Sequence, residues 1–271
     1  MTCSMWQDVC YTANMSLADT HVHLLAGLDD GPDTLSEALA MCRYLVSEGA
    51  AHATALAHQN PDYPDNTPDR LRNAAAALAA ELARKKVPLS VYPTGEVMLG
   101  ADTLADWKAG KCLSVGDRGA YLLVEMPHRA FVDVLPLVAA VAPLRLVIAH
   151  AERYPPLIFD PGRAAAWVAA GCLLQVTAAA LADPWDDDMA RGLREWAAAG
   201  MIHVVGSDGH GIDRRRPLLA EGYRALRKFV GRAATRRIGE EWGPAVLRGD
   251  PIPMMPVPAP PRSWFARVLG C

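Results

Sequence analysis

The stretch Asp19-Thr20-His21-Val22-His23 closes a short apolar run and is soon followed by Asp29-Asp30-Gly31. Residues two apart in an extended segment point to the same side, so His21 and His23 are both expected to face one ion. A second apolar run near the far end of the chain, Val204-Val205-Gly206-Ser207-Asp208-Gly209-His210, also ends in a carboxylate and an imidazole. Both runs are typical of strands that end in metal-ligating side chains.

Between these two runs, short β-rich segments alternate with Ala/Leu-rich amphipathic segments. The predicted strands cover residues 18–25, 53–57, 89–99, 120–126, 144–150, 173–177 and 202–207. The predicted helices cover residues 35–47, 68–84, 130–141, 162–170, 186–199 and 217–231, and several begin with Asp, Thr or Pro and end at Gly. This alternation predicts an α/β fold with a parallel sheet, and seven strands favour a closed or nearly closed barrel.

Composition limits the classes of function. The chain has 271 residues, of which 51% are hydrophobic, so one large domain with a substantial core is expected. Its formal charge of −3 gives no general electrostatic reason to bind nucleic acid or an anionic membrane. Six cysteines without CxxC spacing fit reduced thiols, and there is no export signal or apolar run long enough to span a membrane. We expect a cytoplasmic protein without direct membrane insertion.

Polar side chains recur where the predicted strands end, which is where barrels of this kind carry their chemistry. Any one of them alone, such as His58, Glu96 or Glu125, would be unremarkable as a loop or strand-end residue. Together they form a set of candidate metal ligands: His21, His23, Asp30, His58, Glu96, Glu125, His150, Asp208 and His210. The remaining histidines have ordinary explanations, although His128 follows Glu125 closely enough to line the mouth of the site.

Nine ligands are too many for one ion and suit two or three divalent ions. Imidazole and carboxylate donors without thiolate favour manganese, iron or zinc over calcium. The four carboxylates of the set would leave two divalent ions nearly neutral and three ions with a charge of about +2, which matches a phosphate dianion. A phosphate ester is therefore the expected substrate, attacked by hydroxide that the metal ions generate from water.

Two further motifs bear on phosphate chemistry. Arg153, in the segment Ala149-His150-Ala151-Glu152-Arg153-Tyr154, is suited to binding phosphate with its forked guanidinium; the alternative is a salt bridge with Glu152. Cys112 and Arg118 have the spacing of cysteine-dependent phosphatases. That chemistry needs a strand before the cysteine and a helix after the loop, and here an apolar strand follows instead, so this reading is disfavoured.

The motifs resemble the polymerase-and-histidinol-phosphatase (PHP) superfamily, and within it the manganese-dependent bacterial protein-tyrosine phosphatases of the CpsB/CapC/YwqE type. The segments that carry the resemblance span roughly residues 17–253 and are DTHVHLLAGLDDGPDT, ALAHQ, TGEVML, YLLVEMPHR, VIAHAERY, LLQVTAAAL and HVVGSDGHG. The resemblance implies a distorted seven-stranded (β/α) barrel. It covers a phosphatase domain at residues 17–253. Residues 1–16 are expected to be a disordered N-terminal extension, with an upstream start codon before Met15 as the alternative, and residues 254–271 form a Pro-rich tail.

The resemblance further implies how the ligands divide among three ions. One ion would be held by His21, His23, Glu96 and Asp208; a second by Glu96, which bridges, with Glu125 and His150; a third by Asp30, His58 and His210. Arg153, Asp208 and His210 are expected to act in catalysis, and Arg153, His128 and Gln59 to contact substrate. Gln59 stands where the family usually has His or Arg, so a neutral amide replaces a basic side chain at this position.

The function implied is hydrolysis of phosphotyrosine on the tail of an autophosphorylated tyrosine kinase that controls capsule or exopolysaccharide synthesis. Two alternatives remain open at this point. The same site would also suit a small phosphomonoester such as histidinol phosphate or a nucleotide. A regulator that binds the kinase without turnover is the third hypothesis, and unused carboxylates that repel one another argue against it.

Overall fold

A computed structural model describes residues 16–254. Residues 1–15 and 255–271, which make up nearly all of the predicted N-terminal extension and Pro-rich tail, lie outside the described part. None of the helices within residues 16–254 is long and apolar enough to cross a membrane.

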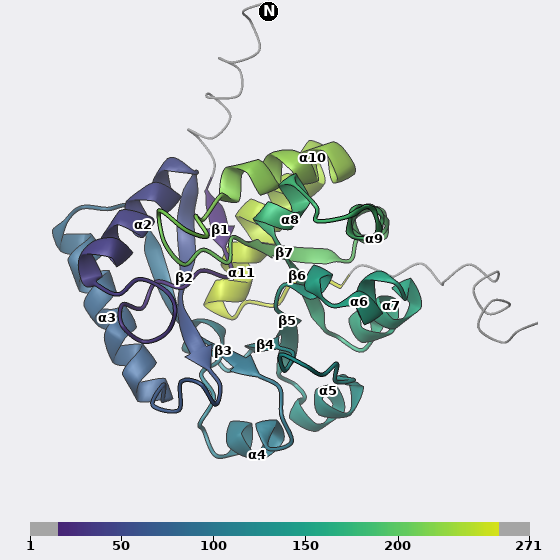
Figure 1. Ribbon diagram of the computed structural model, residues 1–271, viewed down its shortest axis with the longest axis horizontal. Coiled ribbons are helices and arrows are strands. Elements are labelled where there is room, and N and C mark those ends of the chain that lie inside the picture. The colour runs from purple at the N-terminus through teal and green to yellow at the C-terminus, as the bar shows by residue number, and fades with distance from the viewer. Residues whose placement is uncertain (1–15, 255–271) are drawn as a thin grey trace, which may run out of the picture.

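Seven strands form one sheet in which every neighbouring pair is parallel and the spatial order follows the sequence. They are β1 (Leu17–Asp19), β2 (Ala50–Gln59), β3 (Ser90–Met98), β4 (Tyr121–Glu125), β5 (Arg145–Ile148), β6 (Leu173–Thr177) and β7 (Ile202–Gly206). The helices surround these strands (Figure 1). The predicted seven-stranded (β/α) barrel is confirmed.

The barrel closes where the ends of β1 and β7 meet. The Thr20 amide donates to the Val205 carbonyl at 3.2 Å, and beyond the strands the Asp208 amide donates to the His21 carbonyl at 2.7 Å. The prediction of a first strand over residues 18–25 was too long, because β1 ends at Asp19. The Asp19 carboxylate accepts hydrogen bonds from the amides of His21 (3.1 Å) and Ser207 (2.8 Å). A side-chain carboxylate therefore binds these two amides in place of a backbone carbonyl of a neighbouring strand.

Several helices on the outside of the barrel have N-terminal side-chain caps, as expected from the sequence. They are α2 (Leu35–Ser47), α3 (Pro68–Arg84), α4 (Thr103–Lys108), α5 (Leu135–Val141), α6 (Pro155–Ile158), α7 (Pro161–Ala169), α8 (Ala178–Ala182), α9 (Asp187–Ala198), α10 (Leu219–Arg236) and α11 (Gly243–Arg248), with short turns η1 (Val115–Asp117) and η2 (Ala151–Arg153) and a π-helix, η3 (Arg237–Trp242). Thr67 and Asp186 cap α3 and α9 by accepting amide hydrogen bonds.

Helices α2 and α3 have the predicted bounds, and several other regions differ. The helix predicted from residue 130 begins only at Leu135, because the Asp133 carboxylate accepts from the Leu135 amide and from the Trp167 indole. Helices α4, α6, α8 and α11 were not predicted, and all four are short. The helix predicted to end at Gly231 continues to Arg236 through a kink at that glycine, whose φ is 77°.

The amino ends of the strands are covered. Gly243 at the start of α11 packs so closely on β1 that an added Cβ would lie 2.7 Å from the Ala18 Cβ. The Tyr121 hydroxyl on β4 donates to the Asp250 carbonyl at 2.9 Å, which holds the segment after α11 against the barrel. The carboxyl ends of the strands are thus left to carry the site.

Candidate metal centre

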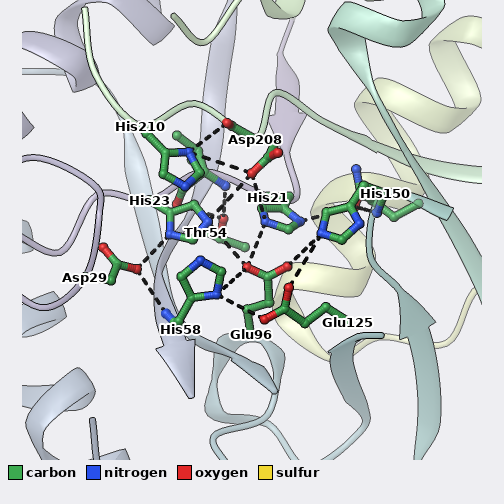
Figure 2. Close-up of polar contacts among 12 residues, drawn as sticks. His21, His23, Asp29, Thr54, His58, Glu96, Glu125, His150, Asp208 and His210 are labelled. Carbon is green, nitrogen blue, oxygen red and sulfur yellow. Dashed lines mark hydrogen bonds and ion pairs between the residues drawn. The ribbon is translucent and has the colours of Figure 1, made fainter. Parts of the chain in front are cut away.

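The nine predicted ligands come together above the carboxyl ends of the strands. Figure 2 labels all of them except Asp30. Glu96, fully buried on β3, lies at the centre of the cluster. Its Oε2 atom is 3.2 Å from His21 Nε2, 3.4 Å from His23 Nε2 and 3.2 Å from His58 Nδ1, and its Oε1 atom is 3.1 Å from His150 Nε2. Four imidazoles from different parts of the chain therefore converge on one carboxylate.

Three groups of ligand atoms are each compact enough to hold an ion, with all atoms of a group within 4.8 Å of one another. The groups are His21, His23 and Asp208; His58, Glu96 and Glu125; and His23, Asp30, His58 and His210. His150 adds a donor beside the second group, because its Nε2 atom is 4.0 Å from Glu125 Oε2. These groups overlap with the division implied by family resemblance, but His23 and His58 are each shared between two groups.

The buried polar atoms that lack hydrogen bonds support a metal-binding role. Among residues 16–254, most buried side-chain polar atoms without a hydrogen-bond partner belong to this cluster: His21 Nε2, His23 Nε2, His58 Nδ1, Glu96 Oε2, Glu125 Oε1 and His210 Nε2. An unsatisfied buried polar atom costs roughly 1–3 kcal/mol, so a folded protein rarely keeps six in one place without a ligand. Nitrogen and oxygen donors in this arrangement fit divalent transition metals.

The far sides of three ligand rings, those of His21, His23 and His150, are held by hydrogen-bond partners. His23 Nδ1 is 2.7 Å from the Asp29 carboxylate, and His21 Nδ1 is 3.2 Å from Gln175 Oε1. The Tyr154 hydroxyl is 3.0 Å from His150 Nδ1. Partners of this kind fix the ring and direct its Nε2 atom into the site.

The role of Asp29 in holding His23, and those of Gln175 and Tyr154, were missed from the sequence. Asp29 was visible as the first residue of Asp29-Asp30-Gly31, but nothing in that motif says which carboxylate faces the ions. Tyr154 ends the segment quoted for Arg153. Gln175 is a polar residue within an apolar strand, and it is 0% exposed. A buried amide in such a strand is a signal that it serves a polar site.

Two of the ligands have strained backbones. His150 follows β5 with a φ of 34°, and Asp208 follows β7 with a φ of 54°. Side chains other than glycine seldom adopt this left-handed region, and such conformations concentrate at functional sites. Each turn re-aims a side chain that would otherwise continue the alternation of its strand.

The carboxylates create a strongly negative field for cations. Burial alone would lower the pKa of His23, but the neighbouring Asp29 and Glu96 carboxylates raise it to about 9. In the same way Asp30 and Glu125 outweigh burial and raise the pKa of His58 to about 11. Since metal ions compete with protons for these nitrogens, the same field attracts divalent cations.

The cluster forms one wall of a pocket of about 610 Å³. The rest of the wall combines basic and apolar side chains: His128, Arg129, Arg153 and Arg215, with Met126, Phe131, Tyr154, Pro155 and Pro156. A site of this composition suits an anionic group attached to an apolar one.

Two arginines converge on the carboxylate of Asp208. Arg153 Nη2 and Arg215 Nη2 are each 2.6 Å from Asp208 Oδ2. Arg153 therefore pairs with Asp208 and not with Glu152, whose carboxylate accepts from the Thr177 hydroxyl at 2.6 Å. Arg215 was missed from the sequence, although it lies in a run of three arginines, residues 214–216, soon after the ligand His210.

The other predicted substrate contacts fall in different places. His128 lies at the mouth of the pocket, with its side chain 67% exposed and Nε2 3.4 Å from Asp62 Oδ2. Gln59 is directed away from the cluster: its amide donates to the carbonyls of Asn66 and Lys111 and accepts from the Leu113 amide. It lines a separate cavity of about 310 Å³. Burial raises the pKa of the Cys112 thiol to about 11, which agrees with the rejection of a cysteine-dependent mechanism.

The fold and the cluster define a (β/α) barrel whose open end carries a histidine and carboxylate centre suited to several divalent ions. Within that class, the chain belongs to the family described as "Capsular polysaccharide synthesis, CpsB/CapC", whose model matches residues 17–248. The resemblance noted in the sequence is thus confirmed.

Named relatives and one solved structure are similar over most of the chain. The tyrosine-protein phosphatase YwqE of Bacillus subtilis is 29% identical over 222 residues, which cover 79% of this chain and 85% of YwqE. The tyrosine-protein phosphatase CpsB of Streptococcus agalactiae is 23% identical over 243 residues, or 87% of this chain and 100% of CpsB. A solved structure described among those of YwqE from B. subtilis and CpsB from Streptococcus pneumoniae, "unique metal-dependent tyrosine phosphatases", has a TM-score of 0.82 at 28% identity and covers 91% of this chain and 100% of its own.

Proposed function

We propose that this protein is a metal-dependent protein-tyrosine phosphatase that acts in capsular or exopolysaccharide synthesis. The observation that carries the proposal is the pocket in which buried ligand atoms without hydrogen bonds face Arg153 and Arg215. Membership of the CpsB/CapC family, with relatives named as tyrosine phosphatases, supports the same reaction.

Two or three divalent ions are part of this proposal, with manganese as the preferred metal and iron or zinc as alternatives. The ligands would be divided as the family resemblance implies: His21, His23, Glu96 and Asp208 at one ion, Glu96, Glu125 and His150 at the second, and Asp30, His58 and His210 at the third. Bound ions would acidify water and offset the charge of the phosphoryl group. In this scheme Asp208 and His210 serve the reaction by holding metal.

The protein's own side chains would bind and orient the phosphotyrosine. Arg153 and Arg215 lie side by side on Asp208, and their remaining N–H groups are suited to phosphoryl oxygens. The apolar wall with Phe131 and Pro155 suits the phenyl ring. His128, at the mouth, would donate a proton from its ring nitrogen to the departing tyrosinate, whose conjugate acid has a pKa near 10.

A flexible peptide is the substrate form that we propose, specifically the phosphorylated tail of a tyrosine kinase of a polysaccharide export system. Side chains at the mouth remain open to solvent, with Arg215 45% exposed and His128 67% exposed. A peptide could therefore stay outside while its phosphotyrosine enters the pocket. A cytoplasmic location follows from this choice of partner, and nucleic acid has no part in it.

The test compares phosphate release from a phosphotyrosine peptide, histidinol phosphate and a mononucleotide, with manganese and then with excess chelator. We expect chelator-sensitive hydrolysis with a clear preference for the peptide. Preference for either small ester would replace the proposed substrate with a metabolite. Inactivity on all three by protein that holds metal would overturn the enzymatic proposal and favour a binding role.

A further inference from the structure

We infer that Trp185 is a positioning residue that holds the guanidinium of Arg153 at the phosphate end of the pocket. This inference rests on the proposed function only in taking Arg153 as a phosphate ligand. Trp185 does not line the pocket itself and belongs to the turn between α8 and α9, far along the chain from Arg153. Nothing in its sequence neighbourhood marks it as part of the site.

The contact is a cation–π interaction. The Arg153 Cζ atom lies over the Trp185 ring at 5.7 Å from its centroid, within the range in which the ring quadrupole attracts a cation. On its other side, Arg153 Nη2 contacts Asp208 Oδ2 at 2.6 Å. The guanidinium therefore lies between an aromatic ring and a carboxylate.

The base of Arg153 is fixed independently of Trp185. The Arg153 amide donates to the His150 carbonyl at 2.9 Å, and the adjacent Glu152 is held by Thr177. The Nε atom, in contrast, is buried and has no hydrogen-bond partner among the described residues. Among the described residues, Asp208 and Trp185 contact the guanidinium directly, and the Glu152 and Glu96 carboxylates attract it without such a contact.

Trp185 has little structural role to explain its presence. It is 67% exposed, the largest value among the exposed large hydrophobic residues of the described chain. Trp185 directly precedes Asp186, the N-cap of α9, which accepts from the Met189 amide at 2.8 Å. This cap fixes the backbone beside Trp185. An exposed indole on a firmly capped turn, stacked on a pocket arginine, is suited to holding that arginine in place.

The experiment measures the dissociation constant of inorganic phosphate by calorimetry in manganese-loaded protein, with metal content determined for every variant. We expect Trp185→Ala to weaken phosphate binding roughly five-fold, the size of one cation–π contact at a partly exposed site. Trp185→Phe, which keeps an aromatic face, should restore most of the affinity. Phe159→Ala is the matched control, because Phe159 is a 61% exposed aromatic residue at the end of α6, and among the described residues no cation–π contact joins its ring to Arg153.

A double-mutant cycle shows whether the effect passes through Arg153. In the Arg153→Ala background, Trp185→Ala should cause no further loss. Additive losses of phosphate affinity in the double mutant would overturn the inference. It would also be overturned if Trp185→Ala bound phosphate as the wild type does but had a higher KM for the peptide, because the ring would then be a peptide contact. Because phosphate binding needs no turnover, failure of the wild type to hydrolyse phosphotyrosine would contradict the proposed function without deciding the role of Trp185.

Discussion

At the scale of single residues, the site depends on side chains that hold other side chains. Several ligand imidazoles have one nitrogen toward the cluster and the other nitrogen in a hydrogen bond, as in the pairs His23 with Asp29 and His21 with Gln175. Asp29 does more than hold one ring, because it also accepts from the amides of Gly31 and His58. One carboxylate thereby positions two of the ligands.

Asp29→Asn should therefore weaken metal binding without unfolding the protein. We expect a 10- to 100-fold loss of manganese affinity, the usual cost of removing a carboxylate behind a ligand histidine. Competition with a fluorescent chelator measures the affinity, and far-ultraviolet circular dichroism checks the fold. The control is Asp33→Asn, an exposed carboxylate nearby. Equal affinities in the two variants would refute the assigned role of Asp29.

Arg215 gives a prediction about substrate binding. Removing a charge-assisted hydrogen bond to phosphate costs roughly 2–3 kcal/mol, so Arg215→Ala should lower kcat/KM for the phosphotyrosine peptide about 30- to 150-fold. Steady-state kinetics at saturating manganese measures this value. Arg216→Ala is a close control, since Arg216 donates to the Ile212 carbonyl and lies over Tyr44. If Arg216→Ala lowered kcat/KM by a similar factor, the loss in Arg215→Ala would come from the removal of positive charge in general and not from a specific contact with phosphate.

At the scale of elements, the sequence predicts strands and long helices well. Strand-helix alternation identified all seven strands, and capping residues gave α2 and α3 their bounds. Ligand residue types at strand ends identified the nine clustered side chains. What could not be predicted depends on contacts between distant segments. The early end of β1 at Asp19 depends on the Ser207 amide, and the strained residues His150 and Asp208 are not glycines, the residue type that most often marks a left-handed conformation.

Gly206, at the end of β7, shows how closely two strands approach beneath the site. An added Cβ would lie 2.4 Å from the His21 Cβ and 2.8 Å from the His21 amide nitrogen. The backbone of a ligand histidine therefore packs directly on β7.

Gly206→Ala should push His21 out of place and lower both stability and metal affinity. Overpacking of this kind costs typically about 1–3 kcal/mol. Urea denaturation in chelator measures the free energy of unfolding, and manganese titration measures the effect on the site. Gly100→Ala is the control, because nothing lies within 4 Å of its added Cβ. If Gly206→Ala were as stable as that control and bound manganese normally, the close approach would not matter.

At the scale of the whole molecule, one histidine outside the site links stability to pH. His203 on β7 is fully buried, and its Nδ1 atom accepts from the Leu174 amide at 3.1 Å. Burial lowers the pKa of His203 from 6.5 to about 4. The unfolded chain therefore takes up a proton below pH 6.5, whereas the folded protein stays neutral here until the pH nears 4.

The stability that His203 contributes is thus present above pH 6.5 and is lost as the pH falls toward 4. Between pH 7 and pH 4.5 the free energy of unfolding of the wild type should fall by roughly 2–3 kcal/mol more than that of His203→Gln. The glutamine keeps a hydrogen-bond acceptor and does not titrate. Urea denaturation across this range in excess chelator measures the difference, with His128→Gln as an exposed control. Parallel pH profiles for the wild type and His203→Gln would contradict the prediction.

The covering of the amino ends of the strands has a consequence for the order of events in turnover. With α11 and the segment after it packed against one end of the barrel, substrate enters and products leave through the other end. Phosphate, formed beside the buried ligands, lies deeper than the tyrosine that carried it. In the proposed reaction the dephosphorylated peptide must depart first and phosphate second. Phosphate should then compete with incoming peptide, and a tail with several phosphotyrosines should be released and rebound between successive hydrolyses.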